Sequence, residues 1–369
     1  MKEKKRFIIS GGGTGGHIFP AIAIANQLKS IIPDAEILFI GASDKMEMKR
    51  VPEAGYNIEG LRIYGIERKL TFKSLIKNLK LPFVVLKALN RAKKIIRDFK
   101  PDAVIGVGGF ASYAALRSAC KLGIPTLIQE QNSYPGITNK KLAGKVNRIC
   151  VAYEGLEKFF PADKIILTGN PIRQEILHLE RKKSESYTAF GLNPERKTLL
   201  VVGGSLGAKT INETLNANID RIKQMDIQLL WQTGELFYNA NKMELSMMQN
   251  DRIKIVPFIR NMNDAYGIAD YIISRAGALA IAELSIISAP TLFVPFRFAT
   301  EDHQTKNAMA LVNKNAALIV KDIETQEKLL PTFERLYRDA NLCDTLSKNM
   351  KQFAEPDAVQ KIVETILSL

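Results

Sequence analysis

The sequence predicts an α/β fold with two doubly wound, Rossmann-like domains that face each other across a cleft. Short apolar runs alternate with helical patterns along all 369 residues, which is typical of parallel sheets covered by helices. A chain of this length is expected to form two domains. Each half also opens in the same way, with an apolar run, a glycine-rich loop and a helix, at residues 6–16 and 198–208.

The predicted strands follow from short runs of apolar residues, because strands buried on both faces are apolar throughout. In the first half they lie at 6–10, 36–41, 103–108, 126–129 and 148–152, with helices at 21–32, 81–99 and 111–121. In the second half they lie at 198–203, 228–233, 253–257, 271–274, 291–294 and 317–320. Residues 169–196, with two prolines and many charges, form the join. We therefore expect domains at 1–168 and 169–354, with a C-terminal helix at 355–369 that packs back on the first domain.

Composition excludes several classes of protein. Hydrophobic residues make up 46% and charged residues 24% of the chain, which excludes disordered and fibrous proteins. The longest uncharged apolar stretch, 286–296, is too short to span a bilayer. The three cysteines, Cys120, Cys150 and Cys343, lie far apart, with neither metal nor disulfide spacing. These features predict a soluble protein of the reducing cytosol.

The positive charge is concentrated in one segment. The chain carries a net charge of +14, and residues 61–100 hold twelve Lys and Arg against two acidic residues. The same segment is rich in Leu, Val and Phe between residues 70 and 97, a combination that favours an anionic membrane surface. The alternative is a core helix with a solvated basic face. A nucleic-acid partner is not expected, because no DNA- or RNA-binding motif accompanies the charges.

Two glycine-rich loops follow predicted strands of the first domain. Residues 11–16 (GGGTGG) match a dinucleotide fingerprint, but no acidic residue ends the second strand, so a nicotinamide enzyme is disfavoured. Gly106, Gly108 and Gly109 form the second loop. Together the loops suggest a polyanionic ligand such as a diphosphate, held by helix N-termini; tight turns or packing are the alternatives. His17, directly after the first loop, is a candidate general base or a loop cap.

The second domain carries a further set of candidate residues. Its glycine loop, 203–208, comes close to a P-loop, and Ser205 could donate to a phosphate. Glu283 could accept the hydroxyls of a ribose or be a helix-surface residue. No Asp-x-Asp motif or metal-ligand spacing is present in the sequence, so we expect neither a metal site nor a cofactor.

Several segments together resemble glycosyltransferase family 28, which has the GT-B fold. They are residues 12–20 (GGTGGHIFP), 106–109 (GVGG), 130–132 (EQN), 169–173 (GNPIR), 203–205 (GGS), 275–279 (RAGAL) with Glu283, and 303–307 (HQTKN). The resemblance runs from about residue 6 to the C-terminus. It departs from the family pattern at Gln129, Leu206, Ala276, Ala280 and Ala282, where side-chain hydrogen bonds to the donor are put in doubt.

The resemblance implies a hexosyltransferase of peptidoglycan synthesis, a process tied to cell shape and division. It would transfer N-acetylglucosamine from UDP-GlcNAc to the C4 hydroxyl of the muramoyl sugar in undecaprenyl-linked lipid I, giving lipid II. The transfer would invert the anomeric carbon and need no metal. The enzyme would lie peripherally on the cytoplasmic face of the inner membrane. A related enzyme with another lipid acceptor, or a UDP-GlcNAc epimerase, is the alternative.

The resemblance also assigns residues to the two substrates. Residues expected to contact UDP-GlcNAc are Thr14, Gly15, Gly16, Asn132, Arg173, Ser205, Ile259, Ala278, Leu279, Ala280, Ile281, Ala282, Glu283 and Gln304. Of these, Ile259 would meet the uracil through its backbone, Glu283 the ribose and Gln304 the sugar. Residues expected at the acceptor diphosphate are Gly13, Gly106, Gly108 and Gly109, with His17 as the candidate base.

Overall fold

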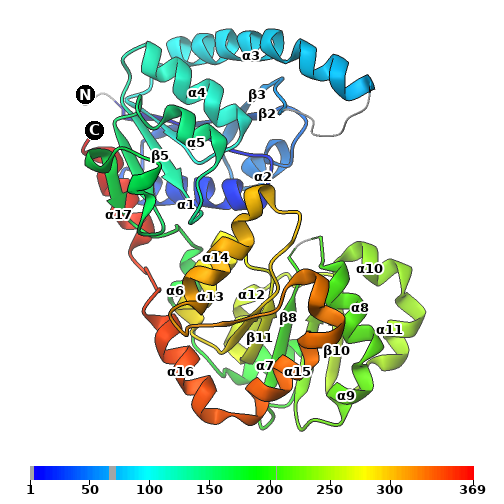
Figure 1. Ribbon diagram of the computed structural model, residues 1–369. Helices are drawn as coiled ribbons and strands as arrows, with labels where there is room; N and C mark the ends of the chain where they lie inside the picture. The colour runs from blue at the N-terminus through cyan, green and yellow to red at the C-terminus, as the bar shows by residue number, and fades with distance from the viewer. Residues whose placement is uncertain (1–3, 66–71, 205) are drawn as a thin grey trace. The chain divides into compact units, whose positions relative to one another are not determined.

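The computed structural model describes residues 4–65, 72–204 and 206–369. By its contacts the chain divides into two compact units, which can be followed in Figure 1. The first comprises Met1–Arg173 and Glu355–Leu369, and the second comprises Gln174–Ala354. The division falls after Arg173, whereas the sequence suggested residue 168, and the C-terminal segment belongs to the first unit. Both units are parallel α/β structures, so the predicted class of two doubly wound α/β domains is confirmed.

The first unit is built on a seven-stranded parallel sheet with the order β3-β2-β1-β4-β5-β6-β7. The strands are β1 (Arg6–Ser10), β2 (Glu36–Ala42), β3 (Asn57–Leu61), β4 (Ala103–Gly106), β5 (Thr126–Glu130), β6 (Arg148–Val151) and β7 (Ile165–Leu167). Chain order reverses between β1 and β4, which are direct neighbours. In open α/β sheets, ligands bind beyond the carboxyl ends of the strands at such a reversal.

Helices cover both faces of this sheet. They are α1 (Gly15–Ile31), α2 (Glu47–Glu53), α3 (Phe72–Phe99), α4 (Phe110–Lys121), α5 (Ile137–Leu142) and α17 (Ala358–Leu367), with short 3-10 turns at Leu156–Lys158 and Ala162–Lys164. Side chains of α3 and α4 share one core cluster with Ile8 and Val104. On the other face, α17 buries Val359, Ile362, Val363 and Ile366 in a cluster with α1. The C-terminal helix is therefore part of the first core.

The second unit is built on a six-stranded parallel sheet with the order β10-β9-β8-β11-β12-β13. The strands are β8 (Thr198–Val202), β9 (Gln228–Gln232), β10 (Ile253–Val256), β11 (Ala269–Ser274), β12 (Thr291–Phe293) and β13 (Leu318–Ile319). Here the order reverses between β8 and β11.

Thirteen helical segments accompany this sheet in the described part of the chain. They are α6 (Gln174–Leu177), α7 (Ser184–Phe190), α8 (Lys209–Ala217), α9 (Ile219–Lys223), α10 (Glu235–Ala240), α11 (Lys242–Met248), α12 (Met262–Ile268), α13 (Ala278–Ile287), α14 (His303–Val312), α15 (Thr325–Arg338) and α16 (Ala340–Lys351), with 3-10 turns η3 (Thr300–Asp302) and η4 (Asp322–Glu324). The carboxyl ends of β8 and β11 lead through the loops 203–208 and 275–277 into α8 and α13, which places two helix N-termini near the reversal.

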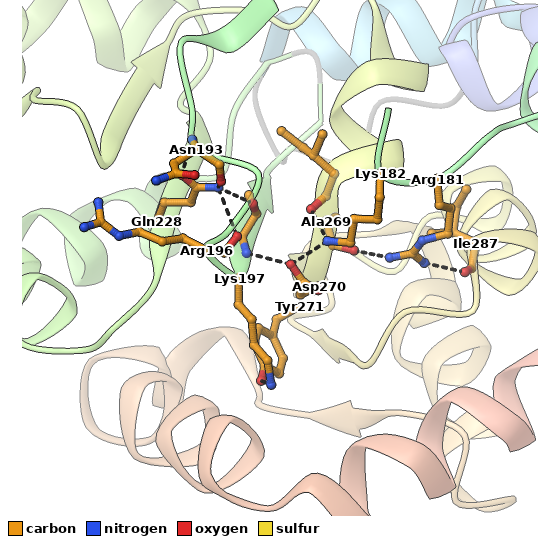
Figure 2. A network of polar contacts seen from close by, with 12 residues as sticks. Arg181, Lys182, Asn193, Arg196, Lys197, Gln228, Ala269, Asp270, Tyr271 and Ile287 are labelled. Carbon is orange, nitrogen blue, oxygen red and sulfur yellow. Dashed lines mark hydrogen bonds and ion pairs between the residues drawn. The ribbon is translucent and has the colours of Figure 1, made fainter. Parts of the chain in front are cut away.

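A polar network ties the join to the opposite, amino edge of the second sheet (Figure 2). Asp270 accepts hydrogen bonds from the backbone N–H of Thr198 at 2.8 Å and from Lys182 Nζ at 2.7 Å. The Arg181 guanidinium donates to the carbonyl groups of Ala269 and Ile287, and burial lowers its pKa. Residues 181 and 182 are thus anchored to the second unit, on the sheet edge away from the glycine loop.

Two strands of the first sheet were not expected from the sequence. Both β3 and β7 lie at the edges of the sheet, and their side chains are mostly half-buried or exposed. An edge strand of this kind does not need the continuous apolar run that marks a central strand. The sequence of β3, NIEGL, accordingly carries a charge and a glycine.

Candidate functional site

The two glycine loops of the first unit pack directly against each other at the carboxyl edge of the sheet. A Cβ on Gly108 would lie 2.8 Å from the His17 ring, and one on Gly109 would lie 2.7 Å from the Gly12 carbonyl oxygen. Both glycines have positive φ angles, +106° and +89°, a region that disfavours other residues. Glycine is therefore required at both positions for the loops to meet.

His17 lies in the first turn of α1, beside this contact. Its Nδ1 is 2.9 Å from the Gly12 carbonyl oxygen. Because a carbonyl oxygen can only accept, Nδ1 must carry the proton, and in the neutral ring the lone pair then lies on Nε2. The imidazole thus holds the loop through Nδ1, and Nε2 is the nitrogen that a general base would use.

The other residues of these loops that were predicted to bind substrate differ in their hydrogen bonds and their burial. Thr14 occupies the N-cap position of α1 without a capping bond from its side chain, and Gly15 and Gly16 begin the first turn, where helix N–H groups favour anions. The N–H of Gly13 already donates to Glu47 Oε2 at 2.9 Å. Gly106 is buried at the end of β4, where a Cβ would lie 2.3 Å from Leu116 Cδ1, so packing accounts for this glycine.

Asn132 is held at the carboxyl end of β5 by a buried carboxylate. Glu130, 1% exposed, accepts from the Asn132 N–H at 3.0 Å and from Asn139 Nδ2 at 2.8 Å. Gln129, one of the departures from the family pattern, donates to Asn170 Oδ1 at 3.1 Å and is fully buried. Arg173 is exposed at the last position of the first unit's main segment.

The second unit also joins two loops at the carboxyl edge of its sheet. A Cβ on Gly207 would lie 2.0 Å from the carbonyl oxygen of Thr233, which follows β9. Gln232 connects the neighbouring loops, since its Nε2 donates to the Gly204 carbonyl at 3.0 Å and its Oε1 accepts from the Ile259 N–H at 2.8 Å. Ser205 lies outside the described residues. Ile259 is buried, so only its backbone could meet a ligand.

The start of α13 contains most of the remaining predicted residues. Gly277 caps the helix, and the positions that follow are Ala278, Leu279, Ala280, Ile281, Ala282 and Glu283. Glu283 is half-buried and accepts a hydrogen bond from the Tyr266 hydroxyl at 3.1 Å. Gln304, in the first turn of α14, accepts from the Phe296 N–H at 2.9 Å. Its carboxamide thereby fixes the loop after β12.

Arg275 and Asp322 form a buried ion pair at this edge that the sequence did not predict. Arg275 donates to Asp322 Oδ1 at 2.5 Å, to the Val294 carbonyl at 3.0 Å and to Thr210 Oγ1 at 3.2 Å. The pair therefore joins the loops after β11 and β12 to the first turn of α8. The family motif contained Arg275, but nothing in the sequence indicated a partner 47 residues away.

The described residues contain no group of three or more His, Cys, Asp and Glu side chains close enough to hold a metal ion. No helix in the described ranges is both long and apolar enough to cross a membrane.

Sequence comparison gives the family. The profile of the glycosyltransferase family 28 N-terminal domain matches residues 7–151, and that of the family 28 C-terminal domain matches residues 198–362. The chain belongs to glycosyltransferase family 28. It is therefore an enzyme of the hexosyltransferase class, and the resemblance found in its motifs is confirmed.

Individual relatives of this family 28 chain extend the comparison over its whole length. The UDP-N-acetylglucosamine--N-acetylmuramyl-(pentapeptide) pyrophosphoryl-undecaprenol N-acetylglucosamine transferase of Cytophaga hutchinsonii is 51% identical, with 100% of this chain and 98% of the relative covered. A crystal structure of Acinetobacter baumannii MurG is 30% identical with a TM-score of 0.79, covering 99% and 100% of the two chains. A UDP-GlcNAc 2-epimerase from Neisseria meningitidis, at 16% identity and a TM-score of 0.68 over 99% and 100%, shares the fold alone.

Proposed function

We propose that this enzyme transfers N-acetylglucosamine from UDP-GlcNAc to the C4 hydroxyl of N-acetylmuramic acid in undecaprenyl-pyrophosphoryl-MurNAc-pentapeptide. The product would be lipid II, formed with inversion at the anomeric carbon and without a metal ion. The observation that carries the proposal is the 51% identity, over the full length of both chains, to a transferase named for this reaction.

UDP-GlcNAc would bind to the second unit. The N-terminus of α13 and the glycine loop after β8 would stabilise the diphosphate, since helix N-termini attract anions. Glu283 would accept the ribose hydroxyls. The N–H of Ile259 is already bonded to Gln232, so its carbonyl oxygen is the backbone group that would accept from uracil. Ser205 and Gln304 would contact the phosphate and the sugar.

The acceptor would bind to the first unit, with its diphosphate at the paired glycine loops. The backbone of these loops, at Gly13, Gly106, Gly108 and Gly109, would approach the phosphates closely, because glycine carries no side chain. The Gly13 N–H is bonded to Glu47, so it would not donate a hydrogen bond to a phosphate. Gly13 would instead let the backbone of the loop come close to the ligand. The residues of this unit that would contact UDP-GlcNAc are Thr14, Gly15, Gly16, Asn132 and Arg173.

The proposed chemistry is a single displacement. The C4 oxygen of the acceptor forms a bond to the anomeric carbon, the bond from that carbon to the diphosphate oxygen breaks, and UDP leaves with its electron pair. The hydroxyl proton passes to His17 Nε2, which the Nδ1–H tautomer makes basic. Helix N-termini stabilise the charge that develops on the departing diphosphate.

Helix α3 would bring the enzyme to the membrane that carries the acceptor. Its solvent face holds Leu79, Phe83 and Leu86, which are 79%, 71% and 57% exposed at helical spacing. Lys80, Lys87 and Lys94 lie exposed on the same helix. An apolar stripe beside lysines suits peripheral binding to anionic lipid. The sequence predicted a membrane-binding segment at residues 70–97. Of this segment, residues 70 and 71 and the side chains of residues 72–77 lie outside the described part of the structure.

UDP release from UDP-GlcNAc tests the proposal, measured with and without a short-chain lipid I analogue and in EDTA. We expect release only with the analogue, at the same rate in EDTA. Release without any acceptor would indicate an epimerase or hydrolase, and release only with another lipid, such as diacylglycerol, would indicate a different acceptor. Loss of activity in EDTA would contradict metal independence.

A further inference from the structure

One peptide group, between Gly12 and Gly13, lies between the side chains of Glu47 and His17. Its N–H, from Gly13, donates to Glu47 Oε2 at 2.9 Å. Its carbonyl, from Gly12, accepts from His17 Nδ1 at 2.9 Å. In a trans peptide these two groups point in opposite directions. The two side chains therefore hold opposite ends of the same planar unit.

Glu47 is fixed firmly enough to determine the orientation of that peptide. It is 0% exposed, and its second oxygen accepts from the N–H of Ala42, the last residue of β2, at 3.0 Å. Glycines make room for it, since a Cβ on Gly12 would lie 2.0 Å from Glu47 Oε1 and one on Gly41 would lie 2.6 Å from Glu47 Cγ. A buried carboxyl group at the start of α2 is thus built into the loop that carries His17.

The contact also has an electronic consequence. A hydrogen bond from a peptide N–H to a carboxylate is stronger than a neutral one. It polarises the peptide, so that the carbonyl at the other end becomes a better acceptor. A better acceptor at Gly12 holds the proton on His17 Nδ1 and fixes the plane of the ring. Histidine ligands and bases commonly depend on such a partner on their second nitrogen.

We propose that Glu47 is a positioning residue for His17, acting through the Gly12–Gly13 peptide. It keeps the imidazole in the Nδ1–H tautomer with Nε2 directed to the acceptor hydroxyl. This inference rests on the proposed role of His17 as the base. It assigns a function in catalysis to a carboxylate that touches no substrate.

The test compares Glu47→Gln with Glu53→Gln, an exposed glutamate at the other end of the same helix. The two N–H groups of Ala42 and Gly13 donate to different oxygens of Glu47, whereas glutamine has an NH2 group in place of one of them and carries no charge. Nitrogen-15 NMR of histidine-labelled protein reads the ring tautomer, and the three histidines allow each signal to be assigned by substitution. Steady-state kinetics measures kcat of each variant, and calorimetry measures its Kd for UDP-GlcNAc.

In Glu47→Gln we expect a lower share of the Nδ1–H tautomer at His17. We also expect kcat to fall about 10–100-fold, the range found for groups that orient metal-bound histidines, with the Kd for UDP-GlcNAc within twofold of wild type. Glu53→Gln should leave the His17 tautomer, kcat and the Kd for UDP-GlcNAc as in the wild type. A folded Glu47→Gln protein with an unchanged His17 signal, or with unchanged kcat, would overturn the proposal.

Two further measurements test the role of Glu47 if the Glu47→Gln protein does not fold. The Gly13 amide of the wild type should be protected from hydrogen exchange, and a freely exchanging amide would contradict the contact. Gly12→Ala, whose Cβ would displace Glu47, should alter the His17 signal in the same direction. The NMR and exchange measurements need no substrate, so they judge the role of Glu47 even if the wild type fails to transfer the sugar.

Discussion

Tyr266 donates its hydroxyl to Glu283 Oε2 at 3.1 Å, which joins α12 to α13 in the second unit. A carboxylate has about four lone-pair positions, so it can accept from ribose hydroxyls as well as from a tyrosine. The hydrogen bond also orients the carboxylate before a nucleotide binds. Glu283 is thus half-buried and bonded to a neighbouring helix of its own unit.

Glu283→Ala should weaken UDP-GlcNAc binding by about 10–100-fold, since hydrogen bonds to a charged group contribute about 1.5–3 kcal/mol. Tyr266→Phe removes only the orienting contact and should cost less, about threefold to tenfold. Isothermal titration calorimetry measures both. Glu327→Ala, an exposed residue on α15, is the control. An unchanged Kd in Glu283→Ala would exclude the ribose role.

His17→Ala should lower kcat by about 10²–10⁴-fold, the range for loss of a general base, while the Kd for UDP-GlcNAc changes little. Steady-state kinetics with saturating acceptor analogue tests this. His178→Ala, at an exposed position, should behave as wild type. If His17→Ala turned over at a nearly normal rate, His17 would be only the loop cap.

Charge reversal on α3 should reduce binding to vesicles that contain anionic lipid. Lys80, Lys87 and Lys94 changed together to Glu should weaken binding by about two orders of magnitude or more, because each basic residue near the surface contributes about 1 kcal/mol. Arg91 is left unchanged because it pairs with Glu59 at 2.8 Å. Vesicle co-sedimentation is the measurement.

The matched control for that triple variant reverses Lys314, Lys348 and Lys351, three exposed lysines of the second unit. It has the same net charge and should bind vesicles nearly as well as the wild type. Equal loss of binding in both triple variants would mean that net charge, and not the α3 surface, controls membrane association.

Arg275→Ala should destabilise the second unit by about 3–5 kcal/mol, because it leaves the buried Asp322 carboxylate unpaired. The only tryptophan of the chain, Trp231, is buried in this unit, so its fluorescence reports urea unfolding there. Lys223→Ala, which breaks an exposed pair with Asp220, should cost under about 1 kcal/mol. Similar losses in the two variants would refute the structural role of the buried pair.

Burial raises the pKa of the Cys150 thiol from its ordinary value of 9.0 to about 12. The folded state thus keeps its proton where the unfolded state loses it. The stability from this difference is fully present below pH 9 and is lost as the pH rises from 9 towards 12.

At pH 10.5 the loss from Cys150 should be about 2 kcal/mol relative to pH 8. Urea unfolding followed by circular dichroism at both pH values measures it, with Cys150→Ala as the reference that lacks this titration. The gap between wild type and variant should narrow at the higher pH. A constant gap would show that the thiol does not titrate on unfolding.

Central elements of the fold could be predicted from the sequence because burial on both faces leaves a clear signal. The bounds of β1 match the predicted run at 6–10, and both glycine loops follow the strands expected. Helix α1 begins at Gly15, six residues earlier than the apolar pattern indicated, because its first turn is made of loop glycines. The edge strands β3 and β7 are not buried on both faces, so they lack the continuous apolar run that marks a central strand.

The partners within the site could not be predicted, because they depend on contacts between distant segments. Glu47 reaches Gly13 across 34 residues, and Arg275 reaches Asp322 across 47. No local spacing encodes either contact. The glycines at positions 12 and 41 were the one sequence feature related to the buried Glu47, because a side chain at either position would collide with it.

The most direct test of the central claim is the structure of the product made from UDP-GlcNAc and a short-chain lipid I analogue. We predict that mass spectrometry will show one added N-acetylhexosamine and that NMR will show it β-linked to the C4 oxygen of the muramoyl sugar. An acceptor recovered unchanged, together with UDP and N-acetylmannosamine, would contradict the account and indicate an epimerase.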